Sequence, residues 1–171
     1  KRLSAHGDIV LTDTILGTPF RYATEGFFQV NIPVYETALR DMQTWVKPGT
    51  VVDMYAGVGS IGLTIGGDDC TLVEIDENAV REMQENISRL DSSAHAVLAA
   101  SEHALEYLTP EATVILDPPR AGLHQVVVDK LLEAKPSRII YLSCNPVTQA
   151  RDVALLSGQY HITHHKGYNF F

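Results

Sequence analysis

The sequence is poor in cysteine and in basic residues, and it lacks any long apolar run. Its two cysteines, Cys70 and Cys144, are too few for a disulfide framework or a four-cysteine metal site, so we expect a reducing, cytoplasmic setting and no metal centre. No run of about 18 apolar residues and no basic-then-apolar leader occurs, so neither a membrane span nor a signal peptide is expected. The formal net charge of -8 argues against a chain that binds the phosphates of a nucleic acid without help from another domain.

Apolar runs that alternate with segments of helical periodicity are what the sequence does contain. A chain of 171 residues that is 45% hydrophobic is large enough to close one core. The alternation, which begins at about residue 34, predicts an α/β fold with a mostly parallel sheet and helices on both faces. The expected strands are 50–55, 71–75, 96–99, 113–116 and 138–142, and the expected helices are 34–42, 77–90, 123–134 and 147–156. Ligands of such sheets bind at the carboxyl ends of the strands.

The first part of the chain differs in kind from the rest. Two short β-like runs, 8–13 and 19–23, lie on either side of Leu16-Gly17-Thr18 and predict a β-hairpin. We therefore divide the chain into a hairpin extension at 1–33 and an α/β domain at 34–171. The chain starts with a lysine and ends in an apolar stretch. We thus expect a piece of a longer protein, with a domain that is incomplete at its C-terminal end.

A glycine turn followed by an acidic residue indicates a nucleotide-like ligand. Gly57 and Gly59 follow the first core strand, where they let the backbone turn tightly and approach a ligand, and a helix can start directly after them. Glu74 ends the next strand, where a carboxylate can accept hydrogen bonds from both hydroxyls of a ribose. The third glycine of the dinucleotide fingerprint is missing, which favours S-adenosylmethionine over a pyrophosphate ligand. A plain connecting turn and a solvated carboxylate are the alternatives.

Two further strand ends carry side chains that could do chemistry. Asp117 precedes Pro118-Pro119, a rigid extended pair that fixes the direction of the carboxylate at the rim of the sheet, although two prolines could also simply end a strand. Cys144 follows the last strand and precedes Asn145-Pro146. It is either a buried small hydrophobe or a nucleophile whose thiolate is stabilised by the start of a helix. Both strand ends would share one edge of the sheet.

Four motifs occur in order along residues 8 to 171. They are Phe28-Gln29-Val30-Asn31, Asp53-Met54-Tyr55-Ala56-Gly57-Val58-Gly59, Asp117-Pro118-Pro119-Arg120-Ala121-Gly122, and Ser143-Cys144-Asn145-Pro146 with Ala150-Arg151-Asp152. In this order the motifs resemble those of the RNA 5-methyluridine (uracil-C5) methyltransferase family, which depends on S-adenosylmethionine. The resemblance implies a Rossmann-like class I methyltransferase fold and an enzyme that methylates C5 of a uridine in structured RNA, either tRNA or rRNA.

The resemblance also implies roles for individual side chains. Cys144 matches the nucleophile that adds to C6 of the uridine, which makes C5 able to attack a methyl group. A general base must then remove the C5 proton. The resemblance implies for this step a glutamate in a His-x-Glu segment beyond Phe171, so full turnover by residues 1–171 alone is not expected. With Gly57 of the turn, the residues expected to bind the cofactor are Gln29, Tyr55, Ser60, Glu74, Ser101 and Asp117.

RNA is the expected partner, and it would present a uridine flipped out of its stack. The resemblance implies a separate N-terminal RNA-binding domain, often an oligonucleotide-binding barrel, which would supply the phosphate contacts that an acidic chain lacks; some members hold an iron–sulfur cluster. Two alternatives stay open. One is a methyltransferase that acts on a base nitrogen or a protein amide, for which no cysteine is needed. The other is a non-catalytic module that binds the cofactor or RNA.

Overall fold

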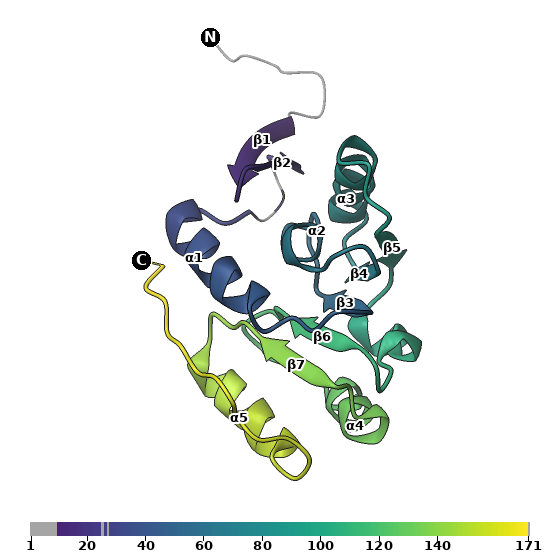
Figure 1. Ribbon diagram of the computed structural model, residues 1–171, viewed down its shortest axis with the longest axis vertical. Helices are drawn as coiled ribbons and strands as arrows, with labels where there is room; N and C mark the ends of the chain where they lie inside the picture. The colour runs from purple at the N-terminus through teal and green to yellow at the C-terminus, as the bar shows by residue number, and fades with distance from the viewer. Residues whose placement is uncertain (1–9, 25, 27, 171) are drawn as a thin grey trace.

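A five-stranded parallel sheet lies at the centre of the computed structural model, which describes residues 10–24, 26 and 28–170 (Figure 1). The strands lie in the order β5, β4, β3, β6, β7. Their bounds are Val51–Met54 for β3, Cys70–Glu74 for β4, His95–Leu98 for β5, Thr113–Leu116 for β6 and Arg138–Tyr141 for β7. The chain builds outward from β3 to β5 and then crosses back to β6. The switch in direction between β3 and β6 is the place where open α/β sheets bind their ligands.

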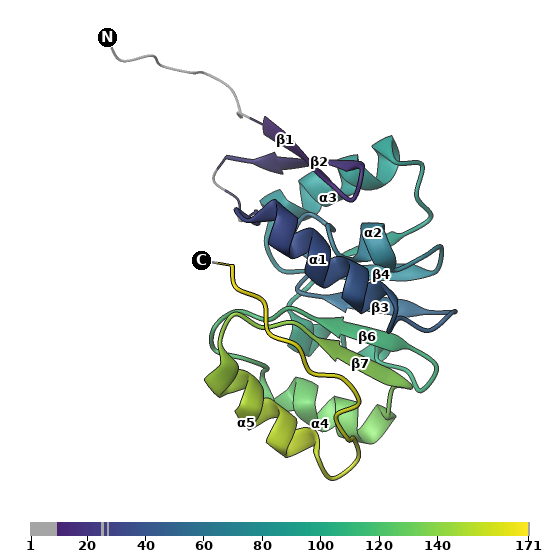
Figure 2. The same cartoon turned by 60° about the vertical axis from the view of Figure 1, so that its left-hand side comes forward.

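Helices cover both faces of this sheet (Figures 1 and 2). On one face lie α1 (Ile32–Gln43), α2 (Gly62–Ile65) and α3 (Glu77–Arg89), and on the other lie α4 (Gln125–Ala134) and α5 (Pro146–Leu156). Two short 3-10 segments, η1 (Ser101–His103) and η2 (Leu105–Tyr107), follow β5. Because successive strand residues point to opposite faces, β3 supplies Val51 to the core under α1 and Val52 to the core under α4.

The hairpin consists of β1 (Val10–Ile15) and β2 (Thr18–Ala23), which pair antiparallel. Leu16 and Gly17 both have positive φ angles, as a tight two-residue hairpin turn requires. The Asn86 side chain of α3 fixes the hairpin, because it accepts a hydrogen bond from Arg21 N at 2.8 Å and donates to Arg21 O at 3.0 Å. The hairpin is thereby attached to the helix that follows Glu74.

The predicted fold class is confirmed, with small differences at the ends of elements. The strand predicted at 113–116 has the bounds of β6, whereas the strand predicted at 50–55 ends at Met54, because Tyr55 adopts a left-handed backbone conformation. Residues 8 and 9 of the first predicted hairpin strand lie outside the described residues. Every helix in the described part of the chain is too short or too polar to cross a lipid bilayer.

Candidate functional site

The turn after β3 lines one side of the candidate site. Tyr55, Gly57 and Gly59 have φ angles of 67°, 57° and 85°, in the left-handed region that non-glycine residues rarely adopt. A side chain added at Gly57 would meet nothing within 4 Å, so the space beside this backbone is open to a ligand. The helix that the sequence places directly after the glycines begins only at Gly62 and has 4 residues. The left-handed turn delays it.

The Glu74 carboxylate, at the end of β4, holds this turn in place. Its Oε2 accepts a hydrogen bond from Gly57 N at 2.8 Å, and its Oε1 accepts from Ile75 N at 2.8 Å and Asp76 N at 2.9 Å. A carboxylate offers about four acceptor positions, so these amides leave one position for a ligand hydroxyl. A second hydroxyl would have to replace the amide of Ile75, which belongs to an exposed residue and can bond to water instead.

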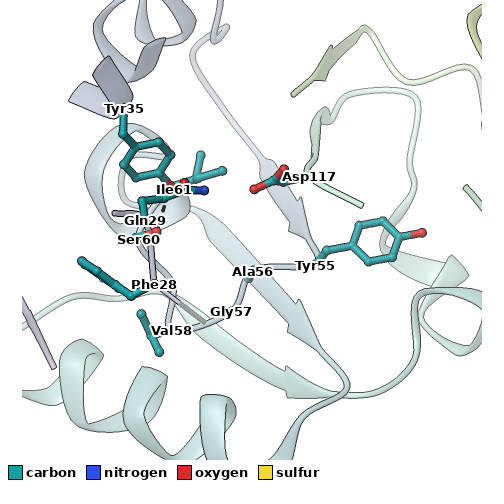
Figure 3. A pocket seen from close by; sticks show the side chains of 10 residues that line it. All are labelled: Phe28, Gln29, Tyr35, Tyr55, Ala56, Gly57, Val58, Ser60, Ile61 and Asp117. Carbon is teal, nitrogen blue, oxygen red and sulfur yellow. Dashed lines mark hydrogen bonds between the residues drawn. The ribbon is translucent and has the colours of Figure 1, made fainter. Parts of the chain in front are cut away.

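A small cavity of about 50 Å³ lies between this turn and the segment before α1 (Figure 3). Asp117 faces Gln29, Ser60 and Tyr35 across the cavity, whereas the Tyr55 ring points away from it. The Oγ of Ser60 is hydrogen-bonded to the hydroxyl of the buried Tyr35 at 2.9 Å. The lining residues are Phe28, Gln29, Tyr35, Tyr55, Ala56, Gly57, Val58, Ser60, Ile61 and Asp117.

Two carboxyl groups beside the cavity are poorly solvated. Asp53 of β3 is fully buried; its Oδ2 accepts from Gly62 N at 2.8 Å, and its Oδ1 has no hydrogen-bond partner among the described residues. The pKa of Asp53 is raised to about 8, mainly by burial and to a smaller extent by the charges of Asp117 and Glu74, while the hydrogen bond from Gly62 N lowers it. Burial also raises the pKa of Asp117 to about 7. At neutral pH the Asp53 carboxyl is therefore mostly protonated, and Asp117 is divided between its two forms.

The raised pKa of Asp53 predicts that stability depends on pH. A carboxyl with a pKa of about 8 in the folded state and about 3.9 in the unfolded state binds more protons when folded. Its stabilising contribution is therefore complete below about pH 4 and is lost as the pH rises to about 8. Asparagine can still accept from Gly62 N but does not titrate. We expect the melting temperature of Asp53→Asn to fall by about 10 °C less than that of the wild type between about pH 5 and about pH 8.

Thermal unfolding across this pH range measures the effect, with Asp129→Asn, on the exposed side of α4, as the matched control. Equal pH dependence in the wild type and in Asp53→Asn would show that Asp53 is ionised in the folded protein, contrary to the burial seen here.

A larger groove adjoins the cavity; it includes the carboxyl ends of the strands and continues along β7 to Arg138 at the amino end of that strand, and along α5 and residues 159–170. Four of the residues singled out from the sequence line both: Gln29, Tyr55, Gly57 and Asp117. Three more line the groove alone: Glu74, Ser101 and Cys144. Ser60 lines only the cavity. All eight expected residues therefore lie at this one edge of the sheet, although they come from six separate segments of the chain.

Tyr55 and Ser101 connect two of these segments. Ser101 is buried at the start of η1, and its Oγ donates a hydrogen bond to the Tyr55 hydroxyl at 2.9 Å. Burial raises the pKa of Tyr55, and the Ser101 hydrogen bond offsets part of this rise. The Tyr55 hydroxyl thus stays protonated at neutral pH; Ser101 Oγ also donates to Glu102 Oε2 at 3.2 Å, so Ser101 shares its single hydrogen between two partners.

Cys144 lies in the turn between β7 and α5, and it is exposed. Asn145 caps α5 by accepting from Val147 N at 3.1 Å, and Pro146 opens the helix. The thiol therefore stands beside a helix N-terminus, where an anion is favoured. Cys70, in contrast, is 3% exposed, and burial raises the pKa of its thiol. Because Cys144 is exposed, the structure excludes the interpretation that it is a buried hydrophobic residue. Its role as a nucleophile stays a prediction.

Sequence reasoning missed the part that two buried residues play in shaping the site. Tyr35 is predicted only as part of the helix at 34–42, yet its hydroxyl is hydrogen-bonded to Ser60 in the cavity. Asp152 was noticed only as a member of a motif, although it is fully buried on α5. A signal was present, since Asp152 lies four residues before the apolar Leu156 on the same helix face, and a charge on an inward face needs partners.

No group of three His, Cys, Asp or Glu side chains within residues 10–24, 26 and 28–170 could hold a metal ion. The two cysteines are both free.

Comparison with known protein families shows the family of this chain. The family described as conserved hypothetical protein 95 matches residues 33–157. The chain belongs to this family. The match runs from the start of α1 to the end of α5, so the family's shared region contains the whole parallel sheet and every expected site residue except Gln29.

Curated relatives carry a common name. A protein of Enterococcus faecalis named as an uncharacterized RNA methyltransferase is 36% identical over 163 residues, which cover 89% of this chain and 35% of the relative. One of Lactobacillus johnsonii with the same name is 34% identical over 176 residues, covering 95% of this chain and 38% of the relative. The chain thus spans about a third of the length of the curated relatives it matches.

Solved structures share the fold. The Pyrococcus abyssi tRNA (uracil-54, C5)-methyltransferase, in complex with S-adenosyl-L-homocysteine, matches with a TM-score of 0.78 and 30% identity over 88% of this chain and 38% of its own. The Thermus thermophilus 16S rRNA N2 G1207 methyltransferase matches with a TM-score of 0.62 over 89% of this chain and 45% of its own, but its 19% identity supports the fold alone. The chain has a Rossmann-like methyltransferase fold.

Proposed function

We propose that the chain is the catalytic part of an S-adenosylmethionine-dependent RNA methyltransferase. The E. faecalis and L. johnsonii relatives are named as RNA methyltransferases, and the P. abyssi structure is of a tRNA methyltransferase with S-adenosyl-L-homocysteine. The formal net charge of -8 is unfavourable for RNA binding. We therefore assign most phosphate contacts to parts of a longer protein that lie outside residues 1–171.

The proposed reaction is methylation of uridine at C5 through a covalent adduct with Cys144. The observation that carries it is an exposed cysteine in the same groove as the expected cofactor residues. Methyl transfer to a base nitrogen needs no thiol, because the nitrogen has its own lone pair. A thiol after β7, the strand next to the one that Asp117 follows, supplies the nucleophile that activation of a poorly nucleophilic carbon requires.

The residues of the groove fit S-adenosylmethionine. Open space lies beside Gly57, and Glu74 has an acceptor position free for a ribose hydroxyl. Tyr55 and Ser101, paired by their hydroxyls, would flank the adenosine end. Gln29 and Asp117, which face each other in Figure 3, would contact the other end of the ligand. When bound, the cofactor supplies a methyl group activated by a sulfonium charge.

The chemistry assigned to this chain begins at Cys144. Its thiolate forms a bond to C6 of the flipped uridine, and the electron pair of the C5–C6 double bond moves onto C5 and O4. C5 then takes the methyl group. A general base, for which the family resemblance implies a glutamate beyond Phe171, removes the C5 proton. The C6–S bond breaks, the double bond re-forms and Cys144 leaves as a thiolate. In its ionised form Asp117 can accept a hydrogen bond from N3–H of the base.

Tritium release tests the assignment to C5. We expect the longer protein to release tritium to water from tRNA transcripts labelled at uridine C5, in proportion to methyl groups transferred, because the C5 hydrogen must leave. The measurement is a charcoal assay with S-adenosylmethionine present and absent, run beside transcripts labelled at cytidine C5. Methyl transfer without tritium release would place the methyl group on another atom and would favour a base-nitrogen methyltransferase.

A further inference from the structure

The Asp152 carboxylate connects three segments of the chain at the carboxyl edge of the sheet. It lies on the inner face of α5, and its side chain is 1% exposed. Its Oδ2 accepts from Leu123 N at 2.9 Å and from the Tyr141 hydroxyl at 2.7 Å. Its Oδ1 accepts from Arg151 Nε at 2.8 Å and from Arg151 Nη2 at 2.7 Å. A buried carboxylate with four donors is fully satisfied.

Neighbours of Asp152 bind the loop that follows Asp117. The carbonyl of Arg120 accepts from Asn145 Nδ2 at 2.9 Å and from Thr148 Oγ1 at 3.1 Å. The carbonyl of Ala121 accepts from Arg151 Nη2 at 3.0 Å. We call the four side chains of this set the clasp; its members are Asn145, Thr148, Arg151 and Asp152. The clasp therefore holds the backbone of 120–123 against the N-cap and the middle of α5 by four hydrogen bonds.

Gly122 shows how closely the loop and the helix approach. It has a φ of +80°, and a Cβ there would lie 2.5 Å from Asp152 Oδ2, 2.6 Å from Arg151 Nη2 and 3.1 Å from Thr148 Cβ. Both the left-handed conformation and the lack of space require glycine. The contact is thus built into the loop as well as into the helix.

The clasp lies between the two strand ends that carry the proposed chemistry. Cys144 directly precedes Asn145, and Asp117 directly precedes the prolines of the clasped loop. We infer that Asp152 is a positioning residue, which fixes the Cys144 thiol relative to Asp117 so that it can attack a uridine held in the groove. The inference rests on the proposed function. A misplacement of about 1 Å can lower such a rate about 10²-fold.

The test compares Asp152→Asn with the wild type, both in the longer protein, in two assays. The first is the rate of covalent adduct formation with tRNA that contains 5-fluorouridine, in the presence of S-adenosylmethionine. The second is the affinity for S-adenosylmethionine by calorimetry. The amide preserves shape but places an NH2 group against donors and removes the charge beside Arg151. We expect adduct formation to slow about tenfold or more while cofactor affinity changes less than about twofold. Tyr141→Phe, which deletes one of the four donors to Asp152, should slow adduct formation less than Asp152→Asn does. Asp129→Asn, on α4, should leave the rate of adduct formation unchanged.

Hydrogen exchange gives a readout that does not depend on the reaction. In Asp152→Asn we expect faster exchange of the Leu123 amide and of the turn around Cys144, but not of the Gly57 amide that bonds to Glu74. An unchanged rate of adduct formation in both Asp152→Asn and Tyr141→Phe would overturn the inference. A loss of cofactor affinity as large as the loss of rate would also overturn it, because that result is expected of a residue that only stabilises the fold. If the wild type forms no adduct, the proposed function is wrong. Unchanged hydrogen exchange of the Leu123 amide in Asp152→Asn would contradict the proposal that the clasp holds the loop, whatever the result of the adduct assay.

Discussion

Replacing Cys144 with alanine should lower methyl transfer to uridine by at least about 10³-fold, because removal of a covalent nucleophile leaves C5 of the base unactivated. Affinity for S-adenosylmethionine should stay within about twofold, since the thiol lies in the groove at the end of β7, away from the Glu74 turn after β4. The measurement is the initial rate of transfer of a labelled methyl group to tRNA, with cofactor affinity determined in parallel.

The matched control is Cys70→Ala. Cys70 is buried beside Gly66, where an added Cβ would lie 2.5 Å from its sulfur, so its role is packing. We expect this variant to unfold at a lower temperature but to keep its methyl-transfer rate within a fewfold when folded. Activity of Cys144→Ala within about tenfold of the wild type would contradict covalent catalysis and would favour transfer to a nitrogen.

Replacing Glu74 with alanine should weaken binding of S-adenosylmethionine about 100-fold or more. The substitution removes the acceptor of three amides, including Gly57 N in the turn that borders the ligand space. It also removes the proposed ribose contact. One ribose hydrogen bond and the Gly57 N bond that shapes the turn, at about 1.5 kcal/mol each, give about 3 kcal/mol, which corresponds to about 100-fold in the dissociation constant.

Calorimetric titration measures this loss, with NAD as a second ligand that should bind neither protein. Glu77→Ala, in the exposed first turn of α3, removes a nearby carboxylate of the same type and should bind like the wild type. Glu74→Gln should fall between the two. An affinity of Glu74→Ala within threefold of that of Glu77→Ala would mean that the cofactor does not use this strand end.

The parts of the fold that the sequence predicted are those set by local patterns. Strand β6, Thr113 to Leu116, is buried throughout and on both faces, so its bounds could be predicted from a continuous run of β-branched and aliphatic residues. Gly57, Glu74, Asp117 and Cys144 could be found as candidates because each ends or follows a strand, and parallel strands end at one edge.

What could not be predicted depends on contacts between distant segments or on unusual backbone conformations. Nothing in the sequence shows that Tyr55, a non-glycine residue, has a φ of 67°, and this conformation is what ends β3 at Met54. The unpaired Oδ1 of Asp53 and the four donors of Asp152 arise from residues that meet only in the folded chain. The sequence marked these aspartates as motif members but not as buried charges.

Covalent trapping tests the central claim most directly. The longer protein is mixed with S-adenosylmethionine and tRNA in which 5-fluorouridine replaces uridine, and its intact mass is recorded. Fluorine cannot leave C5 as a proton does, so the adduct cannot resolve. We predict a protein–RNA complex linked through Cys144, identified by peptide mapping and absent from Cys144→Ala. An unchanged mass at saturating tRNA and cofactor, in a preparation that methylates the unfluorinated tRNA, would contradict the role of Cys144 as nucleophile.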